Sequence, residues 1–234
     1  MKVKLVVFDY DQTLVDSGKG FEVAIKKTMD EFQLFLEAHG INIIVEDYIP
    51  QLKKKMRELD KNRQYDRDLW WNILLKEMGV TEIQFSIDEC IKLTDLYWNI
   101  TAEYTEFYPD TLEILNYLKE KKYKLGLLTD TDGRLGLKKN RLQKSGLFQY
   151  FDGIMIAGDL IPETKPDPAP FRKLASLLNI PPDASVMVGD KPFTDIKGGN
   201  AAGFYTILVL RENWEIDPVP DYQISNLIEI KSIL

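Results

Sequence analysis

The sequence predicts an α/β protein, namely a doubly wound parallel sheet into which a bundle of helices is inserted. The run Val3–Phe8 is apolar and has the length of a buried strand. Residues 16–106 carry their apolar side chains at helical spacing. From residue 107 onward, short apolar runs alternate with helical segments, which is the pattern of a parallel sheet covered by helices.

The stretch 16–106 predicts four helices. Apolar side chains recur at three- and four-residue steps in the segments 21–36, 52–59 and 69–78. A fourth helix begins at Ser86, because Glu89 stands three residues later and completes a capping-box signature. We expect Trp70 and Trp71 mainly to pack this bundle, since aromatic side chains dominate protein cores.

The second half of the chain predicts the rest of the sheet. Its expected strands are the runs 123–128, 153–157, 185–188, 205–210 and 222–224. Expected helices follow Pro109, start at about residue 134, at Pro168 and at Thr194, and end the chain. Such continuous apolar strands indicate burial on both faces. Ligands of these sheets bind beyond the carboxyl ends of the strands. The bundle is inserted after the first strand, so we expect it at that end.

The composition of the chain limits the classes of binding partner that we expect. The chain has 234 residues, a formal net charge of −7 and a pI near 5.0. This acidic balance argues against nucleic acid or a membrane surface as a partner, since those need a basic face. The apolar start is shorter than a signal peptide or a membrane span. We therefore expect a cytoplasmic protein with a small-molecule partner, and the sequence assigns no oligomeric state.

Cysteine and histidine are each present once, as Cys90 and His39. A disulfide framework inside the chain is thereby excluded, and a zinc cluster or a histidine-dependent triad is not expected. We expect Cys90 to be a small buried hydrophobe. His39 stands near the end of an expected helix, at the surface.

Two aspartates follow the first expected strand. Asp9 and Asp11 are one residue apart at the strand end. One can attack an electrophile while the other moves protons, provided that their surroundings differ. Taken alone, the pair suits a polar strand exit with a helix cap equally well.

Three further strand ends carry polar groups. Thr129 and Asp130 follow the run 123–128, and the hydroxyl and nearby amides can hold phosphate oxygens. Lys165 stands in a loop that the following prolines stiffen. Asp190 directly follows the run 185–188 and suits a hard cation.

Each of these groups has an ordinary structural explanation. Asp195, for example, stands at an expected helix start, where a carboxylate suits the helix dipole. Ordinary loop and helix-cap roles do not explain why all of these residues occur together at strand ends, however. Four strand ends supply, in order, Asp-x-Asp, Thr, Lys and Gly-Asp-x-x-x-x-Asp.

The combination resembles the haloacid dehalogenase (HAD) superfamily, in its capped phosphatase branch. Asp9–Leu14 match the family's first motif, Asp-x-Asp-x-Thr/Val-Leu/Val, and Thr129 matches the second. Lys165 matches the third motif, and Asp190 with Asp195 matches the fourth.

The resemblance implies a domain organisation. It covers a HAD-like catalytic core of residues 1–15 and 107–234, while residues 16–106 resemble the family's helical cap in position and type. Gln12 departs from the pattern, because many relatives have glycine there.

The resemblance also implies a function: Mg²⁺-dependent hydrolysis of a small phosphorylated metabolite, a phosphoric monoester. Asp9 would attack phosphorus and form an aspartyl-phosphate. Asp11 would protonate the leaving oxygen and then deprotonate the attacking water. Mg²⁺ would be bound by Asp9, by Asp190 and by the backbone carbonyl of Asp11.

The remaining motif residues would serve the phosphoryl group. Lys165, Thr129 and Asp130 would neutralise and position its oxygens, and Asp195 would orient Lys165 or metal-bound water. Phosphoryl transfer depends mainly on such positioning and charge stabilisation.

Other activities use a related scaffold. Haloacid dehalogenases lack a carboxylate equivalent to Asp11, so Asp11 counts against that activity. A phosphomutase of the same superfamily would use the same residues and return the phosphoryl group to a sugar phosphate. A binding-only protein would not need every catalytic group. A phosphate-acceptor signalling receiver lacks a helical insertion after its first strand.

Overall fold

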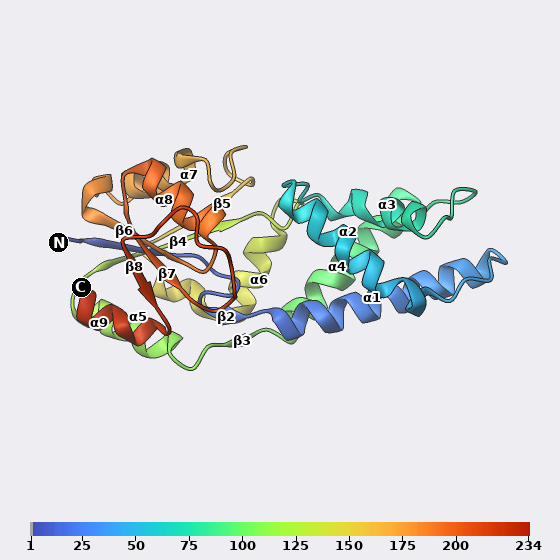
Figure 1. Cartoon of the computed structure of the whole chain (residues 1–234), viewed down its shortest axis with the longest axis horizontal. Coiled ribbons are helices and arrows are strands. Elements are labelled where there is room, and N and C mark those ends of the chain that lie inside the picture. Colours follow the sequence, from blue (N-terminus) through green and yellow to red (C-terminus); the bar gives the residue numbers. More distant parts are fainter. Residues whose placement is uncertain (1) are drawn as a thin grey trace. The chain divides into compact units, whose positions relative to one another are not determined.

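The computed structural model describes residues 2–234 and divides the chain into two compact units (Figure 1). The sheet unit consists of residues 2–17, Thr105–Thr131 and Lys138–Leu234. The helical unit consists of Gly18–Tyr104 together with Asp132–Leu137.

Six parallel strands form the sheet, in the order β5-β4-β1-β6-β7-β8. Their bounds are Leu5–Phe8 (β1), Lys124–Asp130 (β4), Gly153–Ala157 (β5), Ser185–Gly189 (β6), Tyr205–Val209 (β7) and Tyr222–Ile224 (β8). The doubly wound parallel sheet predicted from the sequence is confirmed. The first strand lies in the middle, between β4 and β6.

Helices cover both faces of this sheet (Figure 1). The helices are Thr111–Glu120 (α5), Leu137–Ser145 (α6), Pro168–Leu177 (α7), Lys197–Ala202 (α8) and Ile230–Ile233 (α9). Because successive side chains of a strand point to opposite faces, Val6 packs with the core under α5, α6 and α9, and Val7 packs with the core under α7 and α8. Every residue of β1 is buried, as the apolar run indicates.

Two local details differ from the sequence prediction. The helix expected from about residue 134 begins at Leu137, because Gly136 has a left-handed φ of +91° that no α-helix continues through. The helix expected from Thr194 opens as a π-helical turn, Pro192–Ile196, and only then becomes α8.

A two-stranded antiparallel ribbon was not expected. Val15–Asp16 (β2) pairs with Glu106–Phe107 (β3). Both strands belong to the sheet unit, so the ribbon joins the two points at which the chain leaves and re-enters it.

The helical unit contains the four expected helices, Gly18–Ala38 (α1), Ile49–Lys61 (α2), Trp70–Glu77 (α3) and Ile87–Glu103 (α4). The capping box of Ser86 and Glu89 opens α4 as the sequence predicts. Trp70 and Trp71 are buried in the core of this unit, as expected. The Trp71 indole donates a hydrogen bond to Thr94 across 2.8 Å.

The single cysteine and the single histidine lie where the sequence predicts them. Cys90 is buried in the helical unit, and this burial raises the pKa of its thiol to about 11. His39 is exposed near the end of α1. Within residues 2–234, no helix has both the length and the apolarity that crossing a bilayer demands.

Candidate active site

Several of the predicted site residues converge at the carboxyl ends of adjacent strands. Asp9 follows β1, Thr129 and Asp130 end β4, and Asp190 follows β6. The Asp9 amide donates a hydrogen bond to the Val188 carbonyl across 3.0 Å, which continues the ladder by one residue. Parallel pairing therefore brings segments more than a hundred residues apart to one edge of the sheet.

A buried ammonium connects two carboxylates at this edge. Lys165 Nζ lies 2.6 Å from an oxygen of Asp9 and 2.7 Å from an oxygen of Asp195. Lys165 is 3% exposed, so its charge is largely removed from water. Burial alone would lower the pKa of Lys165, but Asp195 and Asp9 outweigh it and raise that pKa well above its ordinary value. Lys165 is therefore a permanent cation beside Asp9.

Asp130 braces the loop that carries Lys165. One oxygen of Asp130 accepts a hydrogen bond of 2.9 Å from the Lys165 amide. Burial raises the pKa of the Asp130 carboxyl. Thr129, one residue earlier, is buried at the end of β4. The phosphate role of Thr129 stays a prediction, while Asp130 fixes the position of the Lys165 main chain.

Asp190 is the group best suited to a metal ion. Its Oδ1 accepts a hydrogen bond of 3.2 Å from the Thr13 hydroxyl, whereas its buried Oδ2 has no hydrogen-bond partner among residues 2–234. Burial, together with the nearby carboxylates of Asp195 and Asp9, raises the pKa of Asp190 to about 8. A buried carboxylate oxygen without a donor is costly unless a cation binds it.

Three carboxylates offer ligand atoms to one ion. Oxygens of Asp9, Asp190 and Asp195 all lie within 4.8 Å of one another. Both oxygens of Asp195 are already used, one by Lys165 and the other by the Lys191 amide across 3.0 Å. The residues present therefore fit a hard cation held by Asp9 and Asp190, with Asp195 orienting its neighbours.

The Asp11 carboxylate belongs to a different cluster. Its Oδ1 lies 2.6 Å from Arg141 Nη2, and its Oδ2 lies 2.7 Å from Lys138 Nζ. The Ser17 hydroxyl donates to Oδ1 across 2.5 Å. Burial would raise the pKa of Asp11, but the Arg141 guanidinium and the Lys138 ammonium outweigh it and hold that pKa far below its usual range. Asp11 is therefore an anion in this arrangement.

Gln12 shows why glycine is common at its position. Its φ is +62°, in the left-handed region that favours glycine. Its side chain compensates by accepting a hydrogen bond of 2.8 Å from the Ser17 amide and donating one of 3.1 Å to Glu212. The departure from the family pattern thus keeps the turn and adds side-chain contacts.

Sequence reasoning gave no role to Lys191, Lys138 and Arg141, and it named Thr13 only as part of the first motif. Lys191 stands directly after Asp190, and the carboxylates of Asp190, Asp9 and Asp195 raise its pKa against the effect of burial. Because Lys191 stands within the fourth motif, the sequence could have identified it as a site residue. Lys138 and Arg141 carried no such signal, because two cations three residues apart are common on helices.

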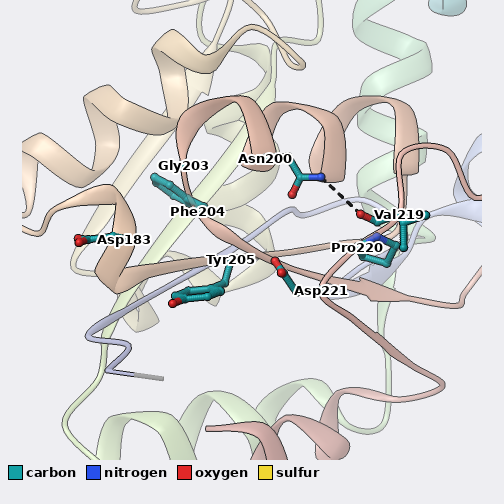
Figure 2. A pocket seen from close by; sticks show the side chains of 8 residues that line it. All are labelled: Asp183, Asn200, Gly203, Phe204, Tyr205, Val219, Pro220 and Asp221. Carbon is teal, nitrogen blue, oxygen red and sulfur yellow. Dashed lines mark hydrogen bonds between the residues drawn. The ribbon is translucent and has the colours of Figure 1, made fainter.

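A separate hollow lies at the other end of the sheet. Its lining includes Asp183, which precedes β6, and Tyr205, which opens β7, as Figure 2 shows. Asp221 also lines it, but its carboxylate accepts a hydrogen bond of 2.8 Å from the Thr206 amide. This hollow lies at the amino ends of the strands, away from the predicted site residues.

Comparisons with known proteins agree with the fold. The profile of the haloacid dehalogenase-like hydrolases matches residues 3–203. The chain therefore belongs to this family and is a hydrolase.

Individual relatives cover nearly the whole chain. It is 27% identical to a glyceraldehyde 3-phosphate phosphatase of Methanopyrus kandleri, over 99% of this chain and 97% of the relative. It is 29% identical to a phosphoglycolate phosphatase of Nitrosococcus oceani, over 99% and 96% of the two chains. The crystal structure of a HAD phosphatase from Thermococcus onnurineus superimposes with a TM-score of 0.70 at 25% identity, covering 100% of this chain and 97% of that one.

Proposed function

We propose that this protein is a magnesium-dependent phosphatase that hydrolyses a small phosphorylated metabolite through an aspartyl-phosphate on Asp9. The buried cluster of Asp9, Lys165, Asp190 and Asp195 carries the proposal. The relatives support the reaction, because they are named as phosphatases of glyceraldehyde 3-phosphate and of phosphoglycolate. The chain is thus a phosphoric monoester hydrolase, and we propose substrates of that size and charge.

In the first step, a carboxylate oxygen of Asp9 forms a bond to phosphorus while the bond from phosphorus to the leaving oxygen breaks. The Lys165 ammonium, 2.6 Å from the Asp9 carboxylate, neutralises negative charge on the phosphoryl oxygens. The buried Thr129 hydroxyl positions one of those oxygens. Asp11 gives the leaving oxygen a proton, which this carboxylate has first taken up from water after one of its ion pairs has opened.

In the second step, water attacks the aspartyl-phosphate and its proton returns to Asp11. The bond between Asp9 and phosphorus breaks, and inorganic phosphate leaves. Both oxygens of Asp11 are engaged by Lys138, Arg141 and Ser17. At least one of these contacts has to open when Asp11 exchanges a proton with the substrate.

Asp9, Asp190 and the backbone carbonyl of Asp11 would hold the magnesium ion. The unpartnered Oδ2 of Asp190 is the observation that supports this assignment. When bound, the ion supplies positive charge that offsets the charge on the phosphoryl group. Asp195 keeps Lys165 and the Lys191 main chain in place.

Free phosphate separates this proposal from its alternative. A phosphomutase of the same superfamily would use the same residues but return the phosphoryl group to a sugar phosphate. Release of inorganic phosphate in proportion to substrate consumed supports hydrolysis, and retention of the phosphoryl group on sugar supports a mutase.

The decisive experiment replaces Asp9 and Asp11 separately. Asp9→Asn removes the nucleophile, so no phosphoenzyme should form with any ester. Asp11→Asn removes only the proton carrier, so an alkyl phosphate should react about 100-fold more slowly or worse, as expected for lost general acid–base catalysis. Nitrophenyl phosphate has a leaving group that needs no proton, so its first step should partly survive and a burst of nitrophenolate should appear.

Mass spectrometry of the quenched Asp11→Asn protein should show phosphate on Asp9, because hydrolysis of the intermediate still lacks its base. Label on another residue would show that Asp9 is not the nucleophile. Equal impairment on both esters, with no burst, would show that Asp11 does not move the proton.

A further inference from the structure

The surroundings of Asp11 point to two residues that no motif contains. Lys138 and Arg141 both lie on α6 and are 4% and 3% exposed. Two buried cations thus meet at one carboxylate, with N–O distances of 2.7 and 2.6 Å. Buried ion pairs add little net stability compared with apolar packing of the same volume. Stability alone is therefore a weak reason for this arrangement.

Helix α6 is a rigid base for these cations. Leu142, next to Arg141, is fully buried in the core beneath the sheet. Lys138 and Arg141 are three residues apart and therefore lie on the same face of the helix. Their charged groups also lie within 5.9 and 5.8 Å of the Tyr10 ring, a distance that allows cation–π attraction.

Hydrogen bonds within the loop that carries Asp11 fix the main chain of that loop. The Tyr10 carbonyl accepts from the Leu14 amide across 3.0 Å, and the Gln12 amide donates to the Val15 carbonyl across 2.8 Å. Neither bond restrains the side chain of Asp11. That side chain takes its direction from Lys138, Arg141 and Ser17.

We propose that Arg141 and Lys138 are positioning residues for Asp11, which hold its carboxylate in one direction until one of their contacts opens for proton exchange with the substrate. The inference rests on the proposed function, since it matters only if Asp11 moves the proton. Arg141 reaches both oxygens of Asp11, at 2.6 Å and 3.5 Å, and is therefore the residue that the test replaces first.

The test is a double-mutant cycle in kinetics. Arg141→Met should lower kcat for an alkyl phosphate by about 100-fold, the cost of a misplaced catalytic group, with KM changed less than about threefold. Nitrophenyl phosphate should be affected less and should show a nitrophenolate burst that the wild type lacks. In an Asp11→Asn background, Arg141→Met should have no further effect on the burst rate or on kcat, because its partner is already gone.

Two control variants distinguish a loss of positioning from a general loss of structure. Arg141→Lys keeps the charge and should recover part of the activity. Lys139→Met removes an exposed cation from the same helix and should behave as the wild type. Urea unfolding followed by circular dichroism establishes that each variant is folded under the assay conditions.

The outcomes distinguish a failure of the positioning role from a failure of the proposed function. If the wild type releases phosphate but the Arg141 and Asp11 effects are additive, or both esters lose activity equally without a burst, the positioning role is wrong. Faster turnover in Arg141→Met would show that the ion pairs restrain Asp11 rather than direct it. A wild type that hydrolyses neither ester would overturn the proposed function and this inference with it.

Discussion

Asp9 and Asp11 are one residue apart, yet their surroundings are opposite. Asp9 shares its site with the carboxylates of Asp190 and Asp195, and burial raises its pKa. Asp11 is surrounded by donors, and Arg141 and Lys138 hold its pKa far below the usual range against the effect of burial. Two carboxylates that differ in this way can take different roles.

The ion pairs of Asp11 predict a pH-dependent stability. Asp11→Asn leaves two buried cations without their carboxylate and should lower the free energy of unfolding by about 3 kcal/mol at pH 7. A carboxyl group whose pKa is lowered on folding contributes stability above its unfolded pKa and loses it as the pH falls towards the folded value. The difference between wild type and variant should therefore be equal at pH 7 and pH 5, and shrink only below the ordinary value of 3.8.

Urea unfolding followed by circular dichroism at several pH values measures this difference. A gap that closes already between pH 7 and pH 5 would contradict the lowered pKa.

At the scale of single residues, the sequence could predict the motif positions but not their partners. Asp9, Thr129 and Asp190 stand at strand ends that hydrophobic periodicity reveals. The contacts of Asp11 with Lys138 and Arg141 span 127 and 130 residues. Such contacts depend on how α6 packs, and no local pattern encodes them.

Among the elements, the end of β6 is where fold and site depend on each other most directly. Gly189 is the last residue of this strand, and a Cβ atom there would overlap the Asp195 carboxylate. Asp195 needs that space because it binds both Lys165 and the Lys191 amide. Glycine at this position is thus a requirement of the site, not of the strand.

Gly189→Ala should displace Asp195 and, through it, Lys165. We expect kcat to fall about 100-fold, as misplaced catalytic groups commonly cost, and stability to fall by about 1–3 kcal/mol from overpacking. Gly126→Ala in β4 is the matched control, because its Cβ would press on Leu174 and Val7 and on no site residue. The control should lose stability and keep its kcat; equal kcat losses in both variants would contradict the role of Asp195.

Elements were predictable where they are long and periodic. The buried strands of the sheet are continuous apolar runs, and the four helices of the helical unit carry clear helical spacing. The ribbon of β2 and β3 escaped prediction because two-residue strands show no periodicity. The predicted start of α6 was too early, because the left-handed backbone conformation of Gly136 prevents the helix from beginning before that residue.

For the molecule as a whole, the buried cluster predicts a link between metal, pH and stability. The pKa of Asp190 is raised to about 8, so the metal-free folded chain keeps a proton there that the unfolded chain has lost. Stability of the metal-free protein should therefore fall as pH rises from about 4 to about 8. Magnesium binds the deprotonated carboxylates, so it should raise the melting temperature more at pH 8 than at pH 5.

Thermal unfolding followed by circular dichroism, with Mg²⁺ or with EDTA, measures both effects. Asp190→Asn should flatten the pH dependence and abolish the response to Mg²⁺, while phosphatase activity should disappear in EDTA. A melting temperature that Mg²⁺ shifts equally at both pH values would contradict the raised pKa, and full turnover in excess EDTA would contradict the metal requirement.

The two units also differ in their tryptophan content, which determines their intrinsic fluorescence. Three of the four tryptophans, Trp70, Trp71 and Trp98, belong to the helical unit, where they are buried. The fourth, Trp214, lies in the sheet unit, partly exposed against the Phe193 ring. Intrinsic fluorescence of this protein is therefore mainly a report on the helical unit. Changes in tryptophan emission will therefore respond mainly to that unit. A tryptophan introduced beside the proposed catalytic residues is needed to follow those residues by fluorescence.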